Sequence, residues 1–149
     1  MVADRPTPSA AGCAPGDDVA AALLRRARLV VGDGDPAHAG LLLDGWPLVR
    51  VDVGGGRVAV NDLRSAAMYA HGVEVGTLPA DAELRLGAVG EELYLLVGEE
   101  ASVFVVPEAG RGAHAEVAVV ASASGQLLLE RAVRYRQVPA SPSCAPARR

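Results

Sequence analysis

The chain contains no lysine, so its 14 basic residues are all arginine. This absence excludes a Schiff-base lysine, a lysine-linked pyridoxal cofactor and the lysine of a phosphate-binding P-loop. The formal net charge of −4 also disfavours binding to duplex nucleic acid, because that binding draws most of its affinity from cationic contacts to phosphate. We therefore expect no cofactor and no duplex nucleic acid as a partner.

Aromatic residues are scarce as well, at 3% of a chain that is 50% hydrophobic. Valine, leucine and alanine must then fill the core, and side chains branched at Cβ favour strands. A chain of 149 residues is long enough to bury such a core within one domain. The composition thus favours a β fold.

The chain has only two cysteines, Cys13 and Cys144, and both stand in proline-rich ends. A bridge between them would close nearly the whole chain, but nothing else in the sequence suggests an oxidising compartment, so we expect reduced, exposed thiols. Neither cysteine has the neighbouring ligands that zinc requires. The stretch AAGC resembles a lipoprotein cleavage box, but no apolar segment precedes it. No run approaches the roughly 20 apolar residues that span a bilayer. These features predict a cytoplasmic protein with no membrane partner.

Proline and small polar residues concentrate at both ends, which predicts disordered tails over 1–16 and 139–149. Between them we predict a single β domain over 17–138. It begins with a helix over 17–28, where aspartates can cap the first turn and apolar residues recur at a spacing of four. A second, short helix is predicted within NDLRSAAMYAHG, with Gly72 closing its end.

Elsewhere apolar and polar residues alternate, as in WPLVRVDV and ELYLLVG. Glycine, proline or acidic residues interrupt this alternation about every ten residues, which is typical of an antiparallel sandwich or barrel. We therefore predict an all-β fold of roughly 8–10 short strands, with one N-terminal helix and one short internal helix.

Three consecutive glycines at 54–56 lie between two alternating runs in VDVGGGRVAV. A phosphate-binding glycine loop leads from a strand into a helix, whose amide groups meet the anion. Here a second strand-like run follows instead, and the pattern GxGxxG is absent. The glycines are therefore predicted to form the turn of a β-hairpin.

The stretch VVGDGDPAHAG places Asp33, Asp35 and His38 within six positions, and these side chains could bind a metal or transfer a proton. A calcium loop needs further oxygen ligands and a distal glutamate, which this stretch lacks. Asp-Gly and Asp-Pro are also strong turn signals. We predict a turn and keep Asp33 and Asp35 as candidate catalytic residues.

The three histidines, His38, His71 and His114, each stand in or beside a predicted loop or helix end. If those loops meet at one end of a barrel, the imidazoles could bind zinc or iron. No two of them share a strand or a helical turn, and the HxH spacing of many β-barrel metal sites is missing. They are candidate metal ligands, with solvated loop histidines as the competing interpretation.

Asp62, Ser65 and His71 bring the residue types of a catalytic triad within ten positions. A triad is defined by its geometry in space rather than by proximity in sequence, and the GxSxG motif of a nucleophile elbow is absent. His71 is nevertheless a candidate catalytic residue beside Asp33 and Asp35.

The segment LLLERAVRYRQV predicts a strand with Arg134 and Arg136 on one face and Arg131 and Tyr135 on the other. Paired arginines can hold a carboxylate, a phosphate or single-stranded nucleic acid, so Arg134 and Arg136 are candidate anion-binding residues. The competing interpretation is the polar outer face of an edge strand.

The lack of a catalytic motif favours a non-catalytic binding or structural β domain, acting through protein–protein contact or self-association. Many of the strand-like segments are apolar, and Trp46 stands beside Pro47 in one of them. Together they offer more apolar surface than one core buries. An apolar sheet face left exposed would mark an interface. The expected partner is another protein or a further copy of the chain. The alternative is a small enzyme or ligand-binding β-barrel whose loop-end site uses histidines and aspartates, with or without a metal.

Overall fold

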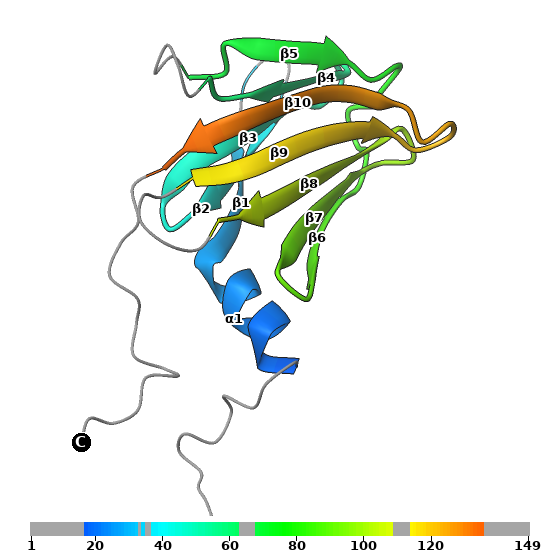
Figure 1. Ribbon diagram of the computed structural model, residues 1–149. Helices are drawn as coiled ribbons and strands as arrows, with labels where there is room; N and C mark the ends of the chain where they lie inside the picture. Colours follow the sequence, from blue (N-terminus) through cyan, green and yellow to red (C-terminus); the bar gives the residue numbers. More distant parts are fainter. Residues whose placement is uncertain (1–16, 33, 35–36, 63–67, 109–113, 136–149) are drawn as a thin grey trace, which may run out of the picture.

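The computed structural model describes residues 17–32, 34, 37–62, 68–108 and 114–135. Ten strands form two antiparallel sheets of five strands each, and one helix precedes them (Figure 1). The predicted all-β class is therefore confirmed, with a sandwich-like arrangement of two sheets. The predicted tails and both cysteines lie outside the described residues.

Each sheet is a meander in which every strand pairs with its neighbour in sequence. The first sheet contains β1 (Ala27–Gly32), β2 (His38–Leu43), β3 (Trp46–Asp52), β4 (Arg57–Val60) and β5 (His71–Glu74). The second contains β6 (Leu84–Val89), β7 (Glu92–Val97), β8 (Ala101–Pro107), β9 (His114–Ala121) and β10 (Leu127–Arg134). Strands β5 and β10 contact each other along one side of the molecule (Figure 1).

The predicted leading helix is confirmed as α1 (Asp17–Arg26), which ends two residues earlier than expected because β1 begins at Ala27. Arg25 and Arg26 occupy its last turn, where the helix dipole favours cations. The helix contacts β1, β6 and β7 and so joins the two sheets on the side away from β5 and β10. Within the described ranges, no helix combines the length and the apolar character needed to cross a bilayer.

The prediction of a second helix is wrong at the C-terminal end of that segment. His71 and Gly72 belong to β5, where Gly72 pairs with Ala59 of β4 and does not close a helix. The missing side chain has a different use, because a Cβ at Gly72 would lie 2.8 Å from Nε of Arg57. Gly72 thus makes room for the Arg57 guanidinium. Residues 63–67, the middle of the predicted helix, lie outside the described part of the chain.

The hairpin predicted for the three glycines is confirmed between β3 and β4. The amides of Gly55 and Gly56 donate to the Asp52 carbonyl oxygen at 3.1 and 2.9 Å. Gly54 and Gly56 have φ angles of 89° and 69°, a region that glycine enters without steric cost. The turn therefore needs glycine for its backbone conformation.

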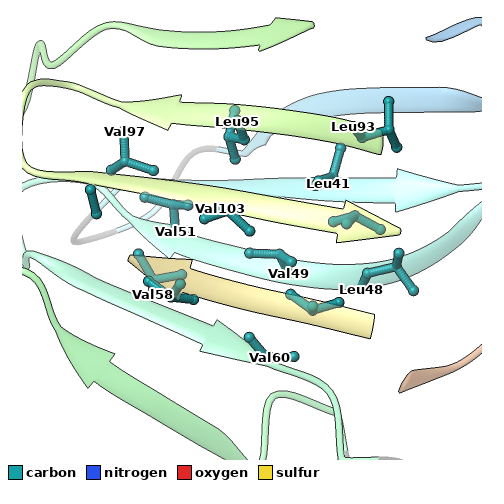
Figure 2. Packing of buried hydrophobic residues seen from close by; sticks show 14 of the residues in the cluster. Leu41, Leu48, Val49, Val51, Val58, Val60, Leu93, Leu95, Val97 and Val103 are labelled. Carbon is teal, nitrogen blue, oxygen red and sulfur yellow. The ribbon is translucent and has the colours of Figure 1, made fainter. Parts of the chain in front are cut away.

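The core lies between the sheets and is built almost entirely from valine and leucine (Figure 2). On β7, Leu93, Leu95 and Val97 are fully buried, and they point into the same interior as Leu41 of β2 (Figure 2). Alternate residues of each strand supply this layer, as expected for two packed sheets. The remaining residues of each strand form two outer faces, which turn away from the opposite sheet.

Candidate functional site

The three histidines lie on different faces of the molecule. His38 begins β2 on the outer face of the first sheet, beside Asp52 of β3 in the register. His71 begins β5 on the inner face, in register with the buried Val60. His114 begins β9, where it pairs with Arg134 on the outer face of the second sheet.

No group of three His, Cys, Asp or Glu side chains among the described residues is arranged to hold a metal ion. The candidates Asp33, Asp35 and Arg136, together with Ser65, lie outside the described residues. Arg134 is exposed on the outer face, as the sequence predicts, and has no second described arginine as its partner there.

The structure brings His71 together with Asp62 and with Arg131 of β10. His71 Nε2 lies 3.0 Å from Asp62 Oδ2, and Arg131 Nη2 lies 3.4 Å from His71 Nδ1. A neutral imidazole that donates from Nε2 to the carboxylate accepts from Arg131 at Nδ1. Both ring nitrogens are then occupied, so the histidine links the two sheets and presents no free base.

Arg131 lies on the inner face of β10, opposite Arg134, as the sequence predicts. Its Nη1 donates to the backbone oxygen of Glu130 at 2.8 Å. Its buried Nε has no hydrogen-bond partner within the described structure. Sequence inspection missed the contact with His71 because the two residues are 60 positions apart.

A double-mutant cycle tests whether His71 and Arg131 act together. We expect His71→Leu and Arg131→Met each to lower the free energy of unfolding by about 1 kcal/mol, because each removes a hydrogen-bond partner from a part-buried polar group. The double variant should lose about 1 kcal/mol less than the two single losses combined. Denaturant unfolding gives all four values. In the matched cycle Arg134→Met takes the place of Arg131→Met. Arg134 lies on the outer face of the same strand, so the losses caused by Arg134→Met and His71→Leu should add. Equal coupling energies in the two cycles would contradict the contact between His71 and Arg131.

A second polar cluster joins the end of α1 to the β2–β3 turn and to the residue after β10. Arg26 donates from Nε and Nη2 to the two carboxylate oxygens of Asp44 at 3.0 and 2.7 Å, and also from Nη2 to the Tyr135 hydroxyl at 3.1 Å. Its hydrogen bonds to Asp44 raise the pKa of Arg26 above the ordinary value. Asp44 and Gly45 have φ angles of 53° and 81°, as an Asp-Gly hairpin turn requires. Strand β10 is therefore tied to the rest of the molecule at Arg131 and at Tyr135.

Replacing Asp44 by asparagine isolates the charge of this cluster, since asparagine also adopts the left-handed conformation. We expect Asp44→Asn to lower the free energy of unfolding by about 1–3 kcal/mol, the value of a hydrogen bond to a charged group. Asp52→Asn is the matched control, because Asp52 pairs with the more exposed Arg50 and should cost less than about 1 kcal/mol. Equal losses in denaturant unfolding would show that the Arg26 cluster is no stronger than a surface pair.

The outer face of the first sheet carries two ion pairs, and Arg28 of β1 is also exposed on it. Arg50 pairs with Asp52 at 2.7 Å, and Arg57 pairs with Glu74 at 3.3 Å. Tyr69 lies across this face, with its hydroxyl 3.8 Å from where a Cβ of Gly40 would be. The charged groups of these two ion pairs already bind each other.

The buried Asn61 holds Tyr69 in place. The amide of Tyr69 donates to Asn61 Oδ1 at 2.8 Å, and Asn61 Nδ2 donates to the backbone oxygen of Pro47. These contacts keep Tyr69 at a φ of 57°, a conformation that few residues other than glycine adopt. Burial raises the pKa of Tyr69, and the nearby charge of Arg50 offsets part of this rise.

The raised pKa of Tyr69 predicts a loss of stability in alkali. Between the ordinary tyrosine pKa of about 10 and the higher pKa in the folded state, the native protein binds more protons than the unfolded chain. The free energy of unfolding must then fall as the pH rises through this window. We expect Tyr69→Phe to remove that fall and to abolish the last tyrosinate absorbance step in an alkaline titration. An unchanged last step would assign it to another tyrosine.

The outer face of the second sheet differs in character, because apolar side chains dominate its centre. We call this surface the apolar face. It is formed by Tyr94, Leu96, Phe104, Val106, Val120 and Leu127, all of which are partly or largely exposed. Tyr94 and Phe104 are direct neighbours on β7 and β8. The Tyr94 ring lies over Gly87, where a Cβ would come within 2.3 Å of it.

The aromatic side chains lie mostly outside the core. Of the five aromatic residues in the chain, only Tyr135 is buried, and Trp46 is 38% exposed. The predicted exposure of apolar surface around Trp46 and along the strands is thus found in the structure. The alternation along the sequence shows which strands have an apolar face. Where both alternating sets of side chains are apolar, it does not show which set turns outward.

Comparisons with protein-family models, with curated proteins and with solved structures give no match for this chain. Function must therefore be argued from the geometry of these surfaces, because a fold by itself does not determine an activity.

Proposed function

We propose that this chain is a non-catalytic binding module that acts through protein–protein contact, and that the apolar face is its contact surface. The observation that carries the proposal is the pairing of Tyr94 with Phe104 at the centre of this face. The chain has a single phenylalanine and three tyrosines, and two of these four residues meet where water has access to them.

The core has no need of this pair. On β8, Val103 and Val105 supply the buried side of the strand, and they are fully buried. The intervening Phe104 could be polar without leaving a gap in the interior. Aromatic residues in the centre of an apolar patch are the ones that most often dominate binding energy. This supports a role for Phe104 outside the fold itself.

The two outer faces also differ in a way that supports the assignment. On the outer face of the first sheet, Arg50 pairs with Asp52 and Arg57 pairs with Glu74. The centre of the apolar face carries no charge, and its charged residues lie toward its margins, among them Arg85 and Glu130. An apolar centre with a polar rim is the usual organisation of a protein interface.

Photo-crosslinking in the native host tests this proposal. A benzoylphenylalanine at position 104 should form covalent adducts with a protein, because its ring would lie inside the contact. The same residue at position 30 is the matched control, since Val30 is 45% exposed on the outer face of the first sheet. Adducts at 104 and not at 30 are expected. Absence of adducts at 104, or equal yields at both positions, would overturn the proposal.

A further inference from the structure

We propose that the partner on the apolar face is a second copy of this chain, so that two copies meet face to face through their second sheets. This inference rests on the proposed function and names its partner. It follows from the self-complementarity of the apolar face in shape and in charge.

The strand register arranges the apolar face in rows that cross the five strands. The central row runs from β6 to β10 through Gly87, Tyr94, Phe104, Ala118 and Glu130. Its residues are small, large, large and small before the terminal glutamate. The Tyr94 ring of the same copy already covers Gly87, so Ala118 is the small residue that is open to a partner. A surface with this order can receive a copy of itself if the large residues of one copy meet the small residues of the other.

A two-fold axis that lies in the interface and runs along β8 produces that match. It carries β7 of one copy over β9 of the other, so that each Tyr94 lies over the partner's Ala118. Phe104 lies on the axis and meets its own counterpart, and aromatic pairs of this kind favour offset stacking. Two-fold contacts between identical surfaces are the commonest form of soluble homo-oligomer.

Two of the charged residues at the margins, Arg85 and Glu130, suit the same axis. Arg85 on β6 and Glu130 on β10 are both exposed and stand at opposite sides of the face, one row apart. The axis carries β6 of one copy over β10 of the other, which brings Arg85 near the partner's Glu130 twice in the dimer.

Glu92 and Glu116 lie in the row of Val106, which is one row inside His114 and Arg134. The same axis carries Glu92 over the partner's Glu116, and this like-charge contact near one end of the face weakens the dimer.

The area is sufficient for a weak to moderate dimer. Five strands at about 4.8 Å spacing, each about 20 Å long, give a face of about 480 Å². Two such faces bury about 1,000 Å², which is the lower end for a specific protein interface. Buried area alone does not determine an affinity, so the association has to be measured over a wide range of concentrations.

Sedimentation equilibrium of the full chain tests the inference across about 1–100 μM. The wild type should show twice the mass of one chain at the upper concentrations. Phe104→Glu should weaken the dimer by about tenfold or more. Val30→Glu, a change at a more exposed apolar residue of the other sheet, should leave it unchanged. A wild-type monomer at every concentration, or equal effects of both variants, would overturn the second copy as partner.

A charge swap tests the two-fold axis without touching the apolar centre. Arg85→Glu and Glu130→Arg should each weaken the dimer, because each places like charges near each other twice. The double variant should restore it, since the two charges are then exchanged. Both residues are exposed, so circular dichroism should show an unchanged fold. Single reversals without effect, or a double variant that is weaker still, would overturn this arrangement.

The two proposals fail in distinguishable ways. In one outcome, crosslinking at position 104 yields adducts only with other proteins while the purified chain is a monomer. That result would support the apolar face as a contact surface and would exclude a second copy of the chain as its partner. If position 104 yields no adduct and the chain is a monomer, both fail. Adducts of twice the chain mass at 104, together with a dimer that Phe104→Glu weakens, support both.

Discussion

Replacing Gly56 by alanine is expected to lower the free energy of unfolding by about 2–5 kcal/mol. The added Cβ would lie 2.1 Å from the carbonyl oxygen of Gly76, a backbone atom that cannot rotate away. Gly56 also has a φ of 69°, which costs other residues about 1–2 kcal/mol. Displacing the crowded backbone adds about 1–3 kcal/mol. Denaturant unfolding of the purified variant measures the sum.

Gly55→Ala is the matched control, one position earlier in the same turn. Gly55 is exposed and its φ is not positive, so an alanine there should change the free energy of unfolding by about 1 kcal/mol or less in either direction. If both substitutions cost the same, the close approach of Gly56 to Gly76 does not contribute to stability in solution.

Leu95→Ala should cost about 2–5 kcal/mol of unfolding free energy, because Leu95 is fully buried in the middle of β7 and its loss leaves a cavity between the sheets. The neighbouring Leu96 points to the apolar face and is partly exposed, so Leu96→Ala should cost about 1 kcal/mol or less. Chemical denaturation of the two variants compares both sides of a single strand.

This pair of substitutions also checks the orientation of the second sheet. If Leu96→Ala proved the more damaging change, the inner and outer faces of β7 would be reversed and the apolar face would be the core. A larger loss for Leu95→Ala, together with weaker association of Leu96→Ala, agrees with the proposed contact surface.

Local features of the fold could be predicted well from the sequence. The glycine hairpin followed from the strand-like run after Gly56, and the leading helix followed from its spacing and its capping aspartates. These features depend on residues that are close in the chain. The short internal helix failed at Gly72, whose lack of a side chain provides space for Arg57, a residue on another strand.

The choice of buried face could not be predicted in the second sheet. In ELYLLVG both alternating sets are largely apolar, so Leu93 and Leu95 had no clear advantage over Tyr94 and Leu96. The opposing sheet decides which set is buried, and this depends on packing between distant segments. In WPLVRVDV the alternate Arg50 and Asp52 resolve the same question from sequence alone.

The candidate sites were predicted least well, because they depend on distances across the fold. The sequence singled out His71 but could not show that Arg131 occupies one of its ring nitrogens. Similarly, Arg26, Asp44 and Tyr135 come from three separate segments. Their grouping becomes visible only when β10 is placed against the first sheet.

The meander order of both sheets has a consequence for how the chain folds. Among the described strands, every ladder joins strands that are consecutive in sequence, and none crosses to a distant partner. Pairing therefore costs little loop-closure entropy, and the chain should fold faster than a Greek-key sandwich of similar length. The stretches 27–74 and 84–134 can each assemble from their own hairpins. The docking of one sheet on the other, which buries the core and joins Arg131 to His71, is then the step at which the long-range contacts are made.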